Sequence, residues 1–219
     1  MLVRHDADRF AALIGAAAEA RGLDPSLIEK DYWAVEALRA VHGGFEVEVG
    51  GQVAQIRPIF KGGTSLSKAF GLIERFSEDI DLLVPIPAHD PKEYSQTERT
   101  TVMKAAAETV SEVLELDGER HGGRRGFDLH RRYPYEPVTG GPIAFDATAD
   151  IRVELTVMGG THPCTAASVK AMVTEHAEGI PQLPTYDDLT PVVIETLAPE
   201  RTPGREARHA PRRRVNSHR

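Results

Sequence analysis

The sequence contains little cysteine and no long apolar run. Cys164 is the only thiol among the 219 residues, so the chain can form no internal disulfide and no zinc site built on several thiolates. No apolar run approaches the roughly 18 residues that a membrane-spanning helix needs. The N-terminal segment carries Asp6 and Asp8 where a secretory signal would have an apolar core. These absences predict a cytoplasmic protein with no membrane partner.

Positive charge is scarce outside the last residues. The net charge is −7, and residues 203–219 hold six Arg and one Glu, so residues 1–202 carry −12. A body this acidic does not resemble a general nucleic-acid-binding surface. The best local candidate for an RNA contact is a basic island of four arginines, although such a run is more often a solvated face. The island consists of Arg124, Arg125, Arg131 and Arg132.

The composition otherwise predicts one folded domain. Apolar residues make up 41% and charged residues 27% of the chain, a balance typical of globular proteins. We expect this domain to span residues 1–202. Residues 203–219 contain only one large apolar side chain, Val215, and cannot bury enough surface to offset the loss of chain entropy. They are predicted to be a disordered basic tail.

Hydrophobic periodicity and turn residues predict an α/β (α+β) domain, with a small mixed sheet flanked by helices. Asp6 and Asp24-Pro25 are typical helix starts, and alternating apolar residues indicate the strands. The expected helices are 6–21, 24–43, 64–76, 97–116 (best from Val102 onward) and 165–177, and the expected strands are 45–49, 53–60, 80–84, 127–135 and 151–158.

The most informative stretch is FKGGTSLSKAFGLIERFSEDIDLLV, residues 60–84. Its predicted strand runs into Gly62 and Gly63, and the following helix begins with Thr64 and Ser65. The start of this helix brings free backbone N–H groups and two hydroxyls to one place, which suits an anionic phosphate. Taken alone, such a turn is more often only a turn.

A pair of carboxylates follows about a dozen residues later. Side chains alternate along a strand, so Asp79 and Asp81 share one face, about 7 Å apart. Two carboxylates on one face are a hard-oxygen site of the kind that holds Mg²⁺ against substrate phosphates. Although a lone Asp-x-Asp is usually solvated surface, the turn, helix and carboxylate strand together indicate a nucleotidyltransferase. Its chemistry depends on positioning and charge neutralisation rather than on a covalent nucleophile.

Three motifs resemble the AbiEii/AbiGii (MenT-like) family of bacterial nucleotidyltransferase toxins. They are EKDYW (29–33), FKGGTSLSKAF (60–70) and RFSEDIDLLV (75–84), with IRVEL (151–155) and LAPERT (197–202) fitting less specifically. The resemblance implies a polymerase-β-like nucleotidyltransferase fold, Mg²⁺ as cofactor and an NTP as substrate. It also implies a place in a toxin–antitoxin or phage-defence system, with a cognate antitoxin as partner and tRNA as the expected acceptor.

The resemblance also assigns site residues. Gly63, Thr64 and Ser65 match the phosphate-gripping turn, which Lys61 and Gly62 precede, and Asp79 and Asp81 match the catalytic, metal-binding pair. Lys61 and Lys68 flank the turn and could each reach a phosphate as a point charge, although a solvated or salt-bridged surface lysine is the more common interpretation of Lys68.

Glu154 is the candidate for a third catalytic acid. In the broad fold a neighbouring strand supplies another carboxylate, and Glu154 lies in the alternating IRVELTV strand. A plain polar-face residue is an equally good interpretation of its position.

The chain departs from the family pattern after Thr202. The family continues with a Glu-Lys helix and later Asp motifs, whereas here the last lysine is Lys170 and the segment after Thr202 is rich in Arg, Pro and His. Such a change is what an out-of-frame or truncated end would produce. Two functions therefore stay open: an active nucleotidyltransferase toxin, and an inactive relative that binds nucleotide, RNA or antitoxin without turnover.

Overall fold

The computed structural model describes residues 1–73, 79–87, 93–140 and 149–201. Its long helices are α1 (Ala7–Arg21), α2 (Pro25–Val41) and α4 (Gln96–Leu114), and its short ones are α3 (Gly62–Lys68) and α5 (Met172–Ala177). Short 3₁₀ helices span Val3–His5, Asp187–Leu189 and Pro199–Arg201. The side chains of Asp6 and Asp24 accept hydrogen bonds from the first turns of α1 and α2, so the predicted helix starts are confirmed. The predicted tail, 203–219, lies outside the described residues.

A seven-stranded mixed sheet forms the centre of the molecule, with strand order β5-β6-β7-β4-β3-β9-β8. Strand β4 runs parallel to β7, and β3 runs parallel to β9, while the other neighbours are antiparallel. The strands are β3 (Ile59–Lys61), β4 (Asp79–Leu83), β5 (Glu119–Gly122), β6 (Asp128–Pro134), β7 (Asp150–Thr156), β8 (Cys164–Val169) and β9 (Val192–Leu197). A separate hairpin pairs β1 (Phe45–Val49) with β2 (Gln52–Ile56).

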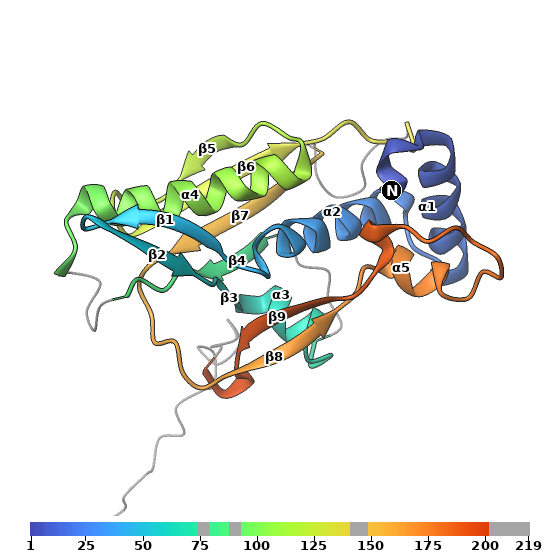
Figure 1. Cartoon of the computed structure of the whole chain (residues 1–219). Coiled ribbons are helices and arrows are strands. Elements are labelled where there is room, and N and C mark those ends of the chain that lie inside the picture. Colours follow the sequence, from blue (N-terminus) through green and yellow to red (C-terminus); the bar gives the residue numbers. More distant parts are fainter. Residues whose placement is uncertain (74–78, 88–92, 141–148, 202–219) are drawn as a thin grey trace, which may run out of the picture.

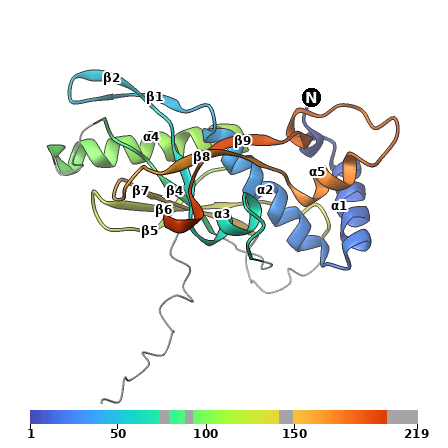
Figure 2. The same cartoon turned by 90° about the horizontal axis from the view of Figure 1, so that it is seen from below.

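One face of the sheet is covered by helices, and the opposite face is only partly covered. Helix α2 contacts β4, β7 and β9, α4 contacts β6 and β7, and the two helices pack on each other. Ile80, Leu82, Val153 and Leu155 are fully buried in the core, whereas the residues that alternate with them are only half-buried. Helix α3 lies beside β3 and β4 (Figure 2). The predicted fold class, a mixed sheet flanked by helices, is confirmed.

The strand predicted over 53–60 is two strands in two different sheets. Strand β2 ends at Ile56 and belongs to the hairpin, while β3 starts at Ile59 in the main sheet. The break falls at Arg57-Pro58, where proline has no N–H to donate to a strand ladder. Strand pairing is interrupted at Pro58, and there the chain passes from the β1–β2 hairpin into the main sheet.

The helix predicted over 165–177 is wrong in its first half. Residues Cys164–Val169 form β8, antiparallel to β9, and only Met172–Ala177 are helical. Alanine favours a helix locally, but here the strand partner decides. That partner, β9, was not predicted, and neither was β5. The helix predicted over 64–76 is shorter: α3 ends at Lys68, and residues 74–76 lie outside the described residues.

A helix that crosses a membrane needs roughly 18 or more mostly apolar residues. None of the described helices has the length and apolar character that a membrane crossing needs.

Candidate active site

The predicted carboxylates lie at the middle of the sheet, on its partly covered face. Asp79 and Asp81 are both on β4 and share this face, as the alternation predicts. Strand pairing sets Asp81 level with Lys61 of β3 on one side and with Glu154 of β7 on the other. Three carboxylates and a lysine from three adjacent strands therefore meet on one face, although Glu154 is 73 residues from Asp81 in the sequence.

Burial and neighbouring negative charge raise the pKa of Asp81 and of Glu154. Desolvation is the main cause that raises the pKa of Asp81, and the charge of Asp79 adds to it. Desolvation likewise raises the pKa of Glu154, and both Asp81 and Asp79 contribute. Carboxylates that are held close together and partly desolvated favour the binding of a cation, because the cation relieves their mutual repulsion.

Two basic side chains partly balance this negative charge. Lys61 Nζ lies 3.5 Å from Asp81 Oδ1, and His130 Nδ1 lies 3.7 Å from Glu154 Oε1. Lys61 and His130 lower the pKa values of Asp81 and Glu154, against the effect of desolvation. All four side chains keep between 24% and 42% of their surface exposed, so the site is open to a ligand from solvent.

Gly62 allows the turn to approach the carboxylates. Its φ is +79°, a conformation that L side chains rarely adopt. A Cβ placed on Gly62 would lie 2.0 Å from Asp81 Oδ2 and 2.9 Å from Asp81 Cβ. The close approach therefore requires glycine at position 62, while Gly63 lies in the first turn of α3.

The two hydroxyls of the predicted phosphate turn are engaged within the protein. Thr64 Oγ1 donates to the carbonyl of Asp79, and Ser65 Oγ donates to the carbonyl of Gly62 at 2.8 Å. Both side chains are buried. These bonds hold the turn against β4, while the side chain of Lys61, the N-cap residue of α3, makes no capping hydrogen bond.

Lys68 anchors α3 to the helical layer. Its Nζ forms an ion pair with Asp31 of α2, a residue with no exposed side-chain surface. Lys68 is thus salt-bridged, but it is not the expected surface lysine, because its side chain is mostly buried and its partner is fully buried. The ion pair fixes the far end of the helix that begins at the turn.

A pocket of about 470 Å³ opens beside the site. Lys61 and Leu83 line it on the site's side, and Met158, Leu197 and Glu200 are among its other lining residues. Its volume is in the range of small-molecule sites. Leu197 and Glu200 belong to the LAPERT motif, so this motif lies next to the carboxylate face.

Sequence reasoning missed two residues on this face and grouped the basic island incorrectly. Arg152 is level with Asp79 across β4 and β7, and His130 is paired with Glu154. Alternation within IRVEL would have placed Arg152 beside Glu154.

Alternation along β6 likewise separates two arginines of the basic island. Arg132 pairs with Asp150 at 3.3 Å, whereas Arg131 donates to the carbonyl of Gly118.

The residues fit a magnesium ion held jointly by protein and substrate. Among the described residues, no group of three or more His, Cys, Asp or Glu side chains is already arranged as a metal site. Mg²⁺ is nevertheless commonly held by one or two carboxylates together with substrate phosphates. Asp79 and Asp81 are suitable donors, since both lie on the accessible face of β4, and burial, with the charge of Asp79, raises the pKa of Asp81.

A Gly turn, a short helix and a carboxylate-bearing strand, set in a mixed sheet, are the arrangement of a nucleotidyltransferase. The family model for the nucleotidyl transferase AbiEii toxin of type IV toxin–antitoxin systems matches residues 54–202. The chain belongs to this family. The match covers the turn, the carboxylates and the pocket, and it begins after the EKDYW motif. A search of curated proteins found no match.

Proposed function

We propose that this protein is a Mg²⁺-dependent nucleotidyltransferase toxin that transfers NMP from an NTP to an acceptor, with tRNA as the acceptor. One observation carries the proposal: Asp79, Asp81 and Glu154 share the accessible face of adjacent parallel strands, with Asp81 and Glu154 level. Membership of the AbiEii family supports the reaction class and a cognate antitoxin. The absence of a spanning helix among the described residues is compatible with action in the cytoplasm.

In the proposed reaction, the acceptor hydroxyl oxygen bonds to the α-phosphorus of the NTP. The α–β phosphoanhydride bond breaks, and pyrophosphate leaves. Asp79 and Asp81 would hold Mg²⁺, which when bound neutralises charge on the phosphates and on the leaving group. We assign Glu154 as the group that takes the hydroxyl proton, because it lies beside Asp81 on the neighbouring strand.

The turn and the pocket would bind the NTP. Lys61 lies within reach of Asp81 and would exchange this contact for a phosphate oxygen. The backbone at Gly62, Gly63, Thr64 and Ser65 would face the triphosphate, as the family's turn does. The neighbouring pocket, of about 470 Å³, has room for a nucleoside.

Nucleotide transfer to RNA tests the proposal. Each of the four α-³²P-labelled NTPs is incubated with total tRNA and the full chain, with Mg²⁺ or with EDTA. We expect labelled tRNA with at least one NTP and Mg²⁺, and none with EDTA. Asp79→Asn and Asp81→Asn should each abolish labelling without unfolding, because Asn keeps the volume but loses the charge that Mg²⁺ requires.

Asp117→Asn is the matched control, because Asp117 is an exposed aspartate outside the site. We expect it to label tRNA like the unchanged protein. Near-normal transfer by the Asp79 or Asp81 variant would contradict the metal assignment. Loss of labelling in Glu154→Gln, with NTP binding retained, is the result expected for a proton acceptor.

Binding without turnover is the second candidate function, and one observation favours it. The last lysine of the chain, Lys170, pairs with Glu178 at 2.7 Å rather than with the carboxylate site. Lys170 is therefore not a second cation of the carboxylate site. If NTP binds with Mg²⁺ but labels no RNA in any of the four reactions, this second function is correct.

A further inference from the structure

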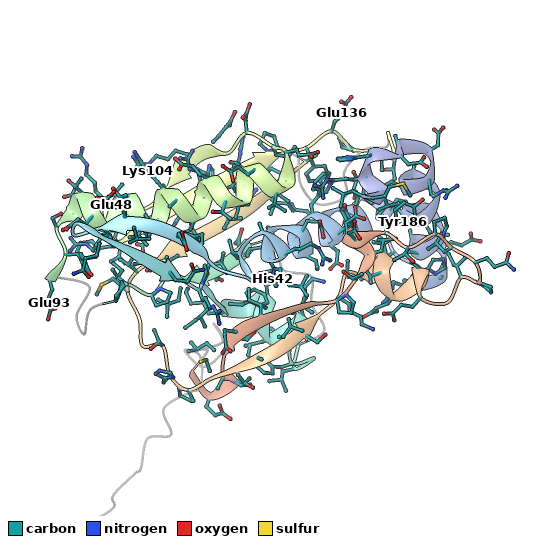
Figure 3. All side chains as sticks on the ribbon, viewed as in Figure 1. His42, Glu48, Glu93, Lys104, Glu136 and Tyr186 are labelled. Carbon is teal, nitrogen blue, oxygen red and sulfur yellow. The ribbon has the colours of Figure 1, made fainter. Side chains whose placement is uncertain are left out.

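A second pocket lies between α4 and the β5–β6 edge of the sheet, and its volume is about 300 Å³. Its charged lining residues are Lys104, Arg120, Arg125, Arg131 and Asp128. Lys104 projects from α4 (Figure 3). Arg131 alternates along β6 with His130, which faces Glu154, so Arg131 points to the opposite face of the sheet. The pocket is therefore separate from the carboxylate site.

The cations of this pocket are not neutralised by the protein. The side chains of Lys104, Arg120 and Arg125 form no hydrogen bond or ion pair with any residue that the structure describes. The pocket's acid, Asp128, already binds Arg124 at 2.6 Å. Arg124 also keeps the pKa of Asp128 below its usual value. Four cationic side chains thus line one pocket, although the first 202 residues of the chain carry a net charge of −12.

Arg131 supplies a buried donor with no partner. Its guanidinium donates from one terminal nitrogen to the carbonyl of Gly118 at 2.6 Å, while Nε is buried and, within the described part of the chain, makes no hydrogen bond. Such a donor is costly to leave unpaired. A ligand with strong acceptor oxygens would satisfy it.

Helix α4 adds hydroxyl donors to the same wall. Thr97, Thr100 and Thr101 line the pocket, and the helical spacing of three and four residues places them on one side of α4. Thr100 donates to the Gln96 carbonyl, whereas the hydroxyls of Thr97 and Thr101 have no partner among the residues with described placement. Hydroxyls and guanidinium groups together match the acceptor oxygens of a phosphate.

We propose that this pocket is a second anion site that binds a phosphate group, either of a phosphorylated small molecule or of an RNA backbone. Clustered positive charge in a pocket produces a focused electric field that attracts an anion. Arginine is the side chain best suited to bind a phosphate. The proposal does not depend on nucleotide transfer, because none of the pocket's lining residues belongs to the carboxylate site.

Pyrophosphate binding to the full chain tests the proposal. Inorganic pyrophosphate is titrated into ¹⁵N-labelled protein in EDTA, and the amide signals are followed by NMR. We expect shifts at Thr97, Thr101 and Gly126. Because a charge-assisted hydrogen bond contributes about a tenfold factor or more, Arg120→Gln/Arg125→Gln should weaken binding at these amides at least about tenfold. Lys104→Gln alone should weaken it less.

Arg21→Gln/Arg57→Gln is the matched control, because it removes the same charge from exposed positions on other segments. The arginines after residue 203 are present in every variant, so they contribute equally. We expect this control to bind like the unchanged protein. Equal binding by the Arg120/Arg125 and control variants, or shifts at Gly62–Ser65 but not at the pocket amides, would overturn the proposal.

A competition arm distinguishes the source of the phosphate. A short single-stranded RNA is added to the pyrophosphate complex. Displacement of pyrophosphate from the pocket amides identifies an RNA backbone as the ligand. Retention of pyrophosphate supports a small phosphorylated ligand. Transfer assays on Asp81→Asn report on the other site, so failure of one proposal is distinguishable from failure of the other.

Discussion

At the residue scale, the tightest constraint in the candidate site is the approach of Gly62 to Asp81. A methyl group at position 62 would meet the Asp81 carboxylate and its Cβ, at 2.0 and 2.9 Å. The Asp81 side chain as a whole would have to move, and with it the proposed Mg²⁺ donor. The glycine turn that is predicted to bind phosphate therefore also restricts the position of the Asp81 carboxylate.

We predict that Gly62→Ala lowers nucleotide transfer about a hundredfold, as expected for a misplacement of about 1 Å in a catalytic group. The positive φ adds a loss of about 1–2 kcal/mol in the free energy of unfolding. Transfer of ³²P-labelled nucleotide and denaturant unfolding measure the two effects.

Gly71→Ala separates strain from displacement. Gly71 has a φ of +62°, and nothing lies within 4 Å of a Cβ built on it. This variant should show a similar loss of stability and near-normal transfer. If the two variants transfer equally well, the position of Asp81 does not control the reaction.

A second residue-scale prediction concerns Glu29 in the EKDYW motif. Glu29 is 1% exposed, and desolvation raises its pKa above 4.5. The folded protein therefore holds this proton to higher pH than the unfolded chain does. Stability must fall as the pH rises above 4.5 through the folded-state pKa, and it stays lower above that pKa.

Glu29→Gln should remove this part of the pH dependence. The Gln carbonyl can still accept the hydrogen bond that Val138 N–H donates to Glu29 Oε1 at 3.1 Å. We expect the melting temperature of the variant to fall less, as the pH rises from 4.5, than that of the unchanged protein. Glu19→Gln, at an exposed position, should change nothing. Parallel melting curves for Glu29→Gln and the unchanged protein would contradict the prediction.

At the scale of elements, a buried ion pair fixes the C-terminal end of α3. Lys68 at the end of α3 meets Asp31 of α2, which also accepts a hydrogen bond from Met172 N–H at 2.7 Å. Asp31 thus joins α2, α3 and the start of α5. A helix of seven residues has little stability of its own, so tertiary contacts of this kind hold it.

We predict that Lys68→Met lowers the free energy of unfolding by about 3–5 kcal/mol, because it leaves the buried Asp31 charge without its cation. Denaturant unfolding monitored by Trp33 fluorescence measures the change. The double variant Asp31→Asn/Lys68→Met removes the charge and keeps an acceptor for Met172 N–H. It should recover most of the stability, and a double variant as unstable as Lys68→Met would show that the charge is not the cause.

The errors in the predicted elements have a common origin. Helices α1 and α2 begin at the predicted aspartates because a cap depends only on neighbouring residues. Strand β8 was predicted as helix because its alanines favour a helix locally, and the partner that makes it a strand is β9, more than 20 residues later. Similarly, β2 and β3 were joined because nothing local to 53–60, apart from Pro58, shows that they belong to different sheets.

At the scale of the whole molecule, the N-terminal segment is tied to a distant part of the chain. Asp188 accepts hydrogen bonds from Val3 N–H at 2.8 Å and from Tyr32 O–H at 2.6 Å. Tyr186 also binds Arg9, and it lies beside α1 (Figure 3). Residues outside the family match thereby complete the same core that supports the carboxylate sheet.

We predict that deletion of residues 203–219 leaves the melting temperature essentially unchanged. These residues contain six arginines and one large apolar side chain, so packing them gains little and ordering them costs entropy. Differential scanning calorimetry on the full and shortened chains measures the effect. A fall of more than a few degrees in the shortened chain, or resistance of the segment to limited proteolysis, would show that it is part of the fold.

The sequence by itself determined the features that depend on neighbouring residues. The helix caps, the shared face of Asp79 and Asp81, and the glycine turn before a helix all follow from periodicities of two or a few residues. The motifs in residues 60–84 also identified the family. These features set the class of chemistry before any tertiary contact is known.

Only the tertiary structure decided which distant residues meet. It set Glu154 level with Asp81, made Gly62 the glycine of close approach, and brought Arg132 to Asp150 and Arg131 to the carbonyl of Gly118. The register between strands far apart in the chain is set by packing of the whole core, and a shift of one residue would turn every side chain to the other face. Local sequence therefore contains the groups of the site, while the packed sheet determines their arrangement.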